Sequence, residues 1–283
     1  MRILITNDDG VSAPGIAVLA RCVADWIEKC PNDDIREAIV VAPQTNYSGM
    51  SAAVGDVFDH PSVKYRRHTI SGAEAIPTYA LEAPPALCAL LGALGSFNFQ
   101  PDVILSGINA GANVGRSILH SGTVGAILTG AQVGLSGLAV SVQWGDEVHY
   151  DTAGAVAIEV LQQLLHAPSR TLLNLNVPNL TSAELKGIRR GRVSTAGVVK
   201  SAGPLAGGEP LADEGELPLR LGAATPELGD VSDEAADDDG ALLAAGYASL
   251  TPLRGPHEDT DTALDDTMHR ALTAIDRHLH ATN

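Results

Sequence analysis

The chain begins, from residue 3, with Ile3-Leu4-Ile5-Thr6-Asn7-Asp8-Asp9-Gly10, an apolar run that leads straight into two adjacent carboxylates. The run from Arg2 to Thr6 is typical of a buried strand. Neighbouring side chains on a strand face opposite sides, so Asp8 and Asp9 converge on one point only if the backbone turns, and Gly10 permits that turn. Two carboxylates that converge there favour a bound cation. Asn, Asp and Gly also favour ordinary turns, so these residues alone leave both interpretations open.

Short β-branched apolar runs recur along the chain, with helical patterns between them. After the first strand we expect strands at 38–42, 103–106, 138–142 and 172–177, and helices at 15–30, 123–133 and 150–165. Pro14 suits the first turn of the first helix. The alternation predicts an α/β fold with a Rossmann-like, doubly wound and mainly parallel sheet.

The character of the chain changes after residue 178, and we expect two regions. Residues 1–184 are predicted to form the Rossmann-like catalytic core, and residues 185–283 a C-terminal extension. The extension contains a stretch, 197–246, rich in Gly, Ala, Pro and Asp, which predicts a long acidic loop or hairpin arm. A short strand is expected at 247–250, followed by an amphipathic helix at about 260–281. The apolar stripe of that helix must dock somewhere, and we expect this hairpin and helix extension to build a homodimer or homotetramer.

The formal net charge is −16, but it is unevenly distributed. Eleven acidic residues and one basic residue lie between 209 and 239, so this window supplies most of the charge. Binding to a nucleic acid duplex requires a basic face, and none is visible. No segment reaches the roughly 18 uninterrupted apolar residues of a membrane span, and no signal peptide pattern opens the chain. We therefore expect a cytoplasmic protein without nucleic acid or membrane partners.

Polar residues follow three of the predicted strands, at the edge where ligands bind an open parallel sheet. They are Asn7, Asp8, Asp9 and Gly10 after the first, Asn46, Ser48 and Gly49 after the second, and Ser106, Gly107, Asn109, Gly111 and Asn113 after the third. Hard oxygen ligands without nearby His or Cys indicate magnesium, manganese or calcium rather than zinc. Two carboxylates with neutral oxygens leave positions for water and for a phosphate.

The stretch His120-Ser121-Gly122-Thr123-Val124-Gly125 opens a predicted helix. Backbone N–H groups at a helix N-terminus, with small residues that allow close approach, form an anion site. Ser121 or Thr123 can equally be a simple N-cap. Beside a predicted metal site, phosphate binding by Ser121, Gly122 and Thr123 is favoured. We interpret His120 as a packing or hydrogen-bonding residue, close enough to the anion site to donate a proton.

These stretches share their order and spacing with a known family. They are residues 3–10, 41–43 with 48–49, 106–113, 121–126, 173–178 and 246–253. The chain resembles the SurE survival-protein nucleotidases, and the resemblance implies a metal-dependent phosphomonoesterase with a Rossmann-like core and exchanged C-terminal segments. By position it implies that Asp8, Asp9, Ser48 and Asn109 hold one divalent metal ion, Mn²⁺ or Mg²⁺, in each subunit.

The predicted function is therefore that of a 5'/3'-nucleotidase, which hydrolyses nucleoside monophosphates. Asp8 and Asp9 would hold the cation while one of them orients or deprotonates a water molecule. Asn109, Asn113 and the 121–123 stretch would hold the phosphate. A covalent role for Asp8 or Asp9 stays open. The alternatives are a non-catalytic nucleotide or phosphometabolite binder, and a phosphatase of a biosynthetic phospho-intermediate.

Two positions depart from the pattern of the family. The chain has Pro85-Ala86-Leu87-Cys88 where Pro-Ala-Asp-Cys is usual, and Thr129-Gly130 where Glu-Gly is usual. Neither position belongs to the implied ligands. We expect Leu87 and Thr129 to affect substrate fit or subunit packing more than the chemistry.

Overall fold

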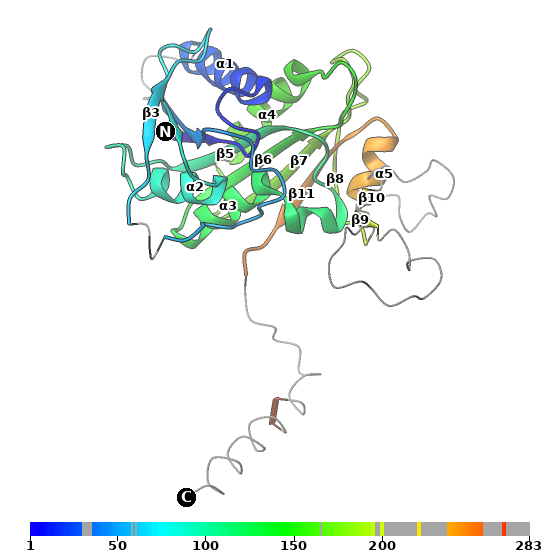
Figure 1. Cartoon of the computed structure of the whole chain (residues 1–283). Helices are drawn as coiled ribbons and strands as arrows, with labels where there is room; N and C mark the ends of the chain where they lie inside the picture. The colour runs from blue at the N-terminus through cyan, green and yellow to red at the C-terminus, as the bar shows by residue number, and fades with distance from the viewer. Residues whose placement is uncertain are drawn as a thin grey trace, which may run out of the picture. The chain divides into compact units, whose positions relative to one another are not determined.

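The structure, a computed structural model, describes residues 1–29, 36–57, 59, 61–164, 166–195, 199–200, 220–221, 237–256 and 268–269. Its main sheet contains nine strands: β1 (Arg2–Thr6), β2 (Glu37–Pro43), β3 (Tyr65–His68), β4 (Thr78–Leu81), β5 (Val103–Ala110), β6 (Ser136–Val142), β7 (Leu172–Val177), β8 (Ile188–Arg190) and β11 (Ala248–Leu253). The strand order is β3-β4-β2-β1-β5-β6-β7-β11-β8 (Figure 1). Six consecutive strands, from β4 to β7, are parallel, whereas β3 and β11 each run antiparallel to their inner neighbour.

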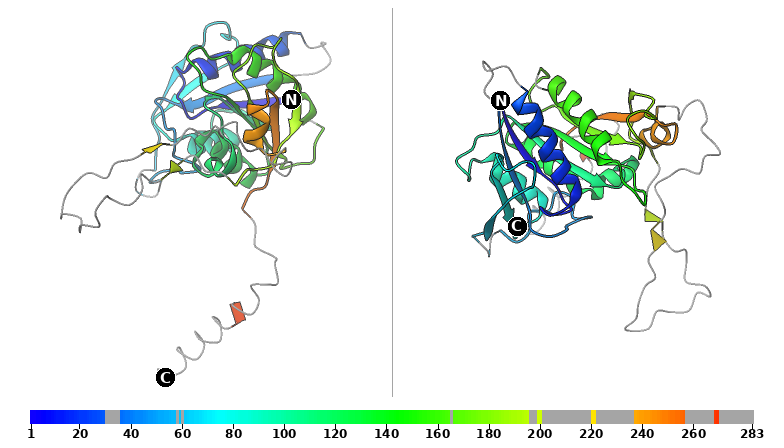
Figure 2. Two further views of the ribbon diagram at one scale, coloured as in Figure 1. Left: turned by 90° about the vertical axis from the view of Figure 1, so that its right-hand side faces the viewer. Right: turned by 90° about the horizontal axis from the view of Figure 1, so that it is seen from above.

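Helices cover both faces of the sheet. They are α1 (Pro14–Glu28), α2 (Pro85–Ala93), α3 (Gly122–Gln132), α4 (Tyr150–Leu164) and the short α5 (Asp239–Ala244), with a 3-10 helix, η1 (Gly115–His120), before α3. α1 and α4 pack side by side on one face, and α2 and α3 pack together on the other (Figures 1 and 2). This is the doubly wound arrangement that the alternating pattern predicts.

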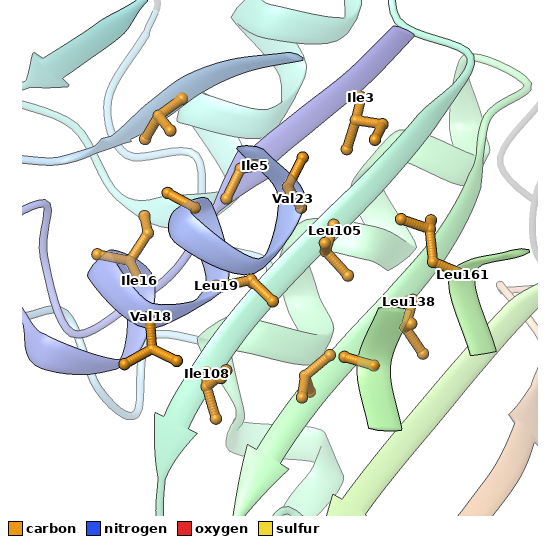
Figure 3. Packing of buried hydrophobic residues seen from close by; sticks show 14 of the residues in the cluster. Ile3, Ile5, Ile16, Val18, Leu19, Val23, Leu105, Ile108, Leu138 and Leu161 are labelled. Carbon is orange, nitrogen blue, oxygen red and sulfur yellow. The ribbon is translucent and has the colours of Figure 1, made fainter. Parts of the chain in front are cut away.

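The core beneath α1 shows why this segment forms a helix there. Ile16, Leu19 and Val23 recur at helical spacing, and all three are fully buried. They pack in one cluster with Ile5 of β1 and Leu105 of β5 (Figure 3). Burial of each such side chain contributes about 1.5–3 kcal/mol. This face of the sheet therefore holds β1 and β5 rigidly next to each other.

The predicted fold class is confirmed, and most predicted elements are present. β1 and β7 have the predicted bounds, and the other predicted strands and helices differ by a few residues at their ends. The predicted end of the first helix, Cys30, lies outside the described residues. The sequence did not predict β3, β4, α2, η1, β8 or α5.

The compact unit runs from Met1 to Leu253, past the boundary expected at residue 184. The reason is that β11 returns to pair antiparallel with β7 and carries β8 at its outer edge. In the predicted arm, β9 (Val199–Lys200) pairs antiparallel with β10 (Arg220–Leu221). Of the helix predicted at 260–281 the structure describes only residues 268–269, which are helical, and the rest of that prediction lies outside the described residues. Among the described residues, no helix has the length and apolar character needed to cross a membrane.

Candidate metal centre and anion site

The candidate site lies where β1 ends. β1 has β2 on one side and β5 on the other, so the chain winds away from it in both directions. Ligands of doubly wound sheets bind at the carboxyl ends of the strands next to such a switch in strand order. The polar residues that follow these three strands are therefore brought to one edge.

The backbone turn after β1 keeps both carboxylates at this edge. Gly10 has a φ of +98°, which favours glycine. The Asn7 side chain donates to the Gly10 carbonyl at 2.9 Å, and Tyr47 N–H donates to the Asp8 carbonyl at 2.7 Å. The turn that the sequence predicts after β1 is thus fixed from within and from the loop after β2.

Asp8 is almost fully buried beneath the start of α3. Its Oδ1 accepts a hydrogen bond of 2.6 Å from the Thr123 hydroxyl. A Cβ added at Gly122 would lie 2.9 Å from Asp8 Oδ2, so the absence of a side chain lets the helix approach the carboxylate. Burial raises the pKa of Asp8, while the bond from Thr123 lowers it.

Asp9 is half-buried and faces the loop after β2. Its Oδ1 accepts from Asn46 Nδ2 at 3.2 Å and from Ser48 Oγ at 3.4 Å. Its Oδ2 lies 3.5 Å from the backbone nitrogen of Ala110, at the end of β5. Burial raises the pKa of Asp9, and the negative charge of Asp8 raises it further. The two carboxylates therefore repel each other in a partly desolvated place.

Asn109 reaches the same edge through an irregularity in β5. The pairing of β5 with β6 shifts register between Ser106 and Asn109, and such bulges re-aim side chains. Asn109 Nδ2 donates to the Gly111 carbonyl at 2.6 Å, which leaves Oδ1 as the oxygen to offer a cation.

These side chains form a donor set that suits a hard divalent cation. Neither Asp8 nor Asp9 forms a salt bridge with a basic side chain in the described part of the chain. The described residues also contain no cluster of three or more His, Cys, Asp or Glu side chains that could hold a metal ion. The set is thus two carboxylates with the neutral oxygens of Ser48 and Asn109. Such a set fits Mg²⁺ or Mn²⁺ with water in the remaining positions, and the cation would relieve the repulsion.

The predicted anion site begins at the N-terminus of α3. The Ser121 hydroxyl accepts from Val124 N–H at 3.1 Å, so Ser121 is the N-cap that the sequence left as an alternative. The Thr123 hydroxyl is used by Asp8. Hydrogen bonds from the backbone of Gly122 and Thr123 also lower the pKa of Asp8, so the positive end of the helix lies against this carboxylate. The candidate metal ligand Asp8 therefore adjoins the predicted anion site.

Asn113 is linked to Asn109 through Ser141 of β6. Its Nδ2 donates to Ser141 Oγ at 2.9 Å, and Ser141 pairs with Asn109 in the β5–β6 register. The Asn113 backbone N–H donates to Asn176 Oδ1 at 2.7 Å. Asn113 is therefore held at the same sheet edge as the other predicted residues.

Comparison with known proteins identifies the family. Residues 3–199 match the family model described as survival protein SurE. This chain belongs to the SurE family. It is 35% identical to the 5'/3'-nucleotidase SurE of Cronobacter sakazakii over 281 residues, which cover 99% of this chain and 96% of that protein. It is 34% identical to the 5'-nucleotidase SurE of Ectopseudomonas mendocina, with 98% and 97% covered. The crystal structure of the SurE protein from Aquifex aeolicus matches with a TM-score of 0.68 at 26% identity, covering 99% of this chain and 100% of that chain.

The two departures from the SurE pattern lie in the packing of α2 and α3. Leu87 belongs to the apolar cluster beneath α2. Thr129 is buried in α3 and donates to the Gly125 carbonyl, four residues earlier, at 2.8 Å. Neither side chain forms a hydrogen bond with the candidate ligands. Leu87 packs among apolar side chains, and the Thr129 hydroxyl is paired within its own helix.

Several supporting residues of this SurE chain were missed by sequence reasoning. Asn176 and Asn174 are fully buried polar residues on one face of β7, and their alternation in the strand was an available signal. Asp239 is fully buried in α5, but nothing in the acidic stretch 209–239 distinguishes it. Burial and the charge of Asp9 raise the pKa of Tyr150, the first residue of α4, which places its phenol near the site.

Proposed function

We propose that this chain is a metal-dependent nucleotidase, which hydrolyses nucleoside monophosphates to nucleoside and phosphate. The observation that carries the proposal is the adjacent pair Asp8 and Asp9, which no described basic side chain neutralises and of which Asp8 lies against the N-terminus of α3. A cation site next to an anion site is what a phosphate ester requires. The nucleotidase names of relatives about 35% identical over nearly the whole chain support the substrate class.

The metal ligands in this proposal are Asp8, Asp9, Ser48 and Asn109, with one Mg²⁺ or Mn²⁺ in each subunit. A bound ion would supply Lewis-acid chemistry, polarising a phosphoryl oxygen and making a water molecule more acidic. Thr123 keeps Asp8 oriented through its 2.6 Å hydrogen bond. Asn46 and Ser48 orient Asp9 in the same way from the loop after β2.

The proton and the phosphate are handled by different groups of this site. Asp9 is the better candidate to orient the attacking water or to accept its proton, because Asp9 is less buried than Asp8. The hydroxyl bond that Asp9 accepts from Ser48 is also longer, at 3.4 Å, than the 2.6 Å bond that Asp8 accepts from Thr123. Phosphate oxygens would bind at the start of α3 with Asn109 and Asn113, where the N–H groups of Gly122 and Thr123 would exchange their contact with Asp8 for the phosphate as charge develops. A covalent aspartyl step uses the same groups and stays an alternative.

Phosphate release tests the proposal directly. The substrates are nucleoside 5'- and 3'-monophosphates and an aryl phosphate, with Mn²⁺, with Mg²⁺ and after EDTA. We expect metal-dependent release that EDTA abolishes, with nucleotides preferred. Tight nucleotide binding by calorimetry without release under any metal would instead support a non-catalytic binder. Release from the aryl phosphate but from no nucleotide would support a phosphatase of another phospho-intermediate.

The cytoplasmic location and the homodimer or homotetramer stay predictions from the sequence. Light scattering of the full-length chain during size-exclusion chromatography measures the oligomeric state. A monomer at micromolar concentration would contradict the predicted role of the C-terminal extension in assembly.

A further inference from the structure

One segment connects the two parts of the candidate phosphate site. We call residues 113–121 the η1 segment, because η1 forms most of it. Asn113 stands at its start, and Ser121, the N-cap of α3, stands at its end. The separation between Asn113 and the helix N-terminus therefore depends on how firmly the η1 segment is held.

The first residue of the η1 segment is fixed by β7. The Asn176 side chain binds the Asn113 backbone through both of its polar atoms, with Oδ1 accepting from N–H at 2.7 Å and Nδ2 donating to the carbonyl at 3.1 Å. Asn174 Nδ2 donates to the same carbonyl at 2.8 Å. Both asparagines are fully buried, so water does not compete for these bonds.

The other end of the η1 segment is fixed by the loop after β2. Ser51 Oγ donates to the Leu119 carbonyl at 2.7 Å, and Ser51 N–H donates to the His120 carbonyl at 3.2 Å. These bonds tie the end of η1 to the same loop that carries Ser48.

Between these two anchors, the start of η1 is held by a carboxylate from the C-terminal part of the compact unit. Both oxygens of Asp239 accept from Gly115 N–H, at 3.1 and 2.9 Å, across 124 residues of sequence. The same carboxylate accepts from Ser194 N–H at 3.2 Å and from Gly240 N–H at 2.9 Å. Asp239 is fully buried, and hydrogen bonds from N–H groups to a charged acceptor are stronger than neutral ones.

This set of donors calls for a carboxylate in particular. Three backbone N–H groups from separate segments converge on one side chain, and an ionised carboxyl group only accepts hydrogen bonds. An asparagine of the same shape would turn an NH₂ group toward at least one of these N–H donors. The carboxylate at residue 239 is therefore matched to the loop that it holds.

We propose that Asp239 is a positioning residue for phosphate binding, which sets the η1 segment so that Asn113 and the N-terminus of α3 together fit a phosphate group. The inference rests on the proposed phosphatase function. It adds that the segment around α5, far from the metal ligands in sequence, tunes the affinity for phosphate and not the affinity for metal.

The test compares Asp239→Asn with Asp238→Asn. Asp238 is the adjacent acidic residue, and the carboxylate that accepts from Gly115 N–H is that of Asp239, so Asp238→Asn matches the charge change and leaves this loop contact in place. The measurements are kcat and KM for a nucleoside monophosphate, Ki for inorganic phosphate, and the calorimetric Kd for Mn²⁺ alone. For Asp239→Asn we expect KM and Ki to rise about tenfold, since a bond to a charged group is lost, with the Kd for Mn²⁺ unchanged. Asp238→Asn is expected to match the wild type in all four.

A purely structural role gives a different result. Partial unfolding of Asp239→Asn would lower kcat and the Mn²⁺ stoichiometry together while KM and Ki stayed at wild-type values, and that would overturn the inference. Asp239→Ser is the second variant, because its hydroxyl still accepts one N–H, and we expect intermediate values of KM and Ki. If neither variant folds, Asp239 serves fold stability and the inference is wrong.

The two proposals fail in different ways. If the wild type is active and Asp239→Asn retains its KM and Ki, only the positioning role fails. If the Mn²⁺-loaded wild type neither releases nor binds inorganic phosphate, the proposed function fails as well.

Discussion

Asp8 and Asp9 are adjacent, partly desolvated and of the same charge, and the described residues offer them no basic partner. Burial raises the pKa of both, which means that the ionised pair destabilises the metal-free fold. A protein keeps such an arrangement where function requires it. The hydrogen bonds from Thr123 and Ser48 orient the carboxylates but do not remove the charge. The missing compensation is what a divalent cation supplies.

We predict that Asp9→Asn abolishes turnover and leaves the fold intact. The amide has the shape of the carboxylate, but it cannot accept a proton from water and binds a cation weakly, so kcat is expected to fall by about a thousandfold or more. Steady-state kinetics at saturating Mn²⁺ measures the loss, and circular dichroism checks the fold. Residual activity near one tenth of the wild type at saturating metal would contradict the assigned role.

We predict that Gly122→Ala weakens metal binding by displacing Asp8. The new methyl group would lie 2.7 Å from Asp8 Cβ and 2.9 Å from Pro85 Cγ, so the carboxylate or the start of α3 must move. The expected result is a rise of about tenfold or more in the Kd for Mn²⁺ and a similar fall in kcat/KM, because small misplacements of ligands have large effects. Gly255→Ala is the control, since in the described part of the chain no heavy atom other than those of its chain neighbours lies within 4 Å of its added methyl group. Equal Mn²⁺ affinity in the two variants would show that Asp8 adapts without loss.

At the scale of single elements, the local pattern decided what could be predicted. α1 was predictable because one face is apolar at helical spacing, and β1 and β7 because they are short apolar runs between polar ends. α2 is apolar almost all round, so it has no period to detect. β3 and β8 are exposed strands of mostly basic residues. They are strands only because β3 pairs with the edge of β4 and β8 pairs with the edge of β11.

The candidate site divides in the same way. The ligand candidates follow strands, so fold class and strand order alone bring them together. Asn176 and Asp239 act through backbone groups at Asn113 and Gly115, and such partners depend on tertiary pairing that no local pattern encodes. Asp239 also lies among ten other acidic residues between 209 and 239, so its type carries no signal.

We predict that Gly125→Ala separates α3 from the loop after β2. A Cβ at Gly125 would lie 2.2 Å from the Ser51 carbonyl oxygen and 2.7 Å from Ala52 N, and backbone atoms cannot yield as a flexible side chain does. We expect a loss of about 1–3 kcal/mol in the free energy of unfolding, which corresponds to several degrees in Tm. The loop also carries Ser48, so kcat/KM should fall. Thermal unfolding beside Gly255→Ala measures the effect, and a Tm equal to that control would contradict the tight contact.

On the scale of the compact unit, residues late in the chain complete a site that begins at residue 8. β11 pairs with β7, whose Asn176 holds Asn113, and α5 precedes β11 and carries Asp239. Loss of the segment 237–253 would therefore remove the edge of the sheet beyond β7 and the carboxylate that holds η1. The acidic window 209–239, which overlaps the start of this segment, supplies most of the net charge, while the site itself depends on the few acidic residues that are buried.

Metal binding should be visible in the stability of the whole molecule. A ligand that binds only the folded state stabilises it by about 2.7 kcal/mol at a concentration of 100 Kd, which corresponds to roughly 5–10 °C in Tm for a domain of this size. We therefore expect Mn²⁺ to raise the Tm of the wild type by several degrees and EDTA to reverse the rise. In Asp9→Asn the rise in Tm with Mn²⁺ should be lost. Without metal, the variant should unfold at or above the Tm of the wild type, because one of two repelling, partly buried charges is gone. Differential scanning calorimetry of both proteins with and without Mn²⁺ measures these four temperatures. An equal rise in both proteins would mean that metal binding does not depend on the Asp9 carboxylate. A metal-free variant several degrees less stable than the wild type would mean that Asp9 stabilises the fold through its hydrogen bonds more than its charge destabilises it.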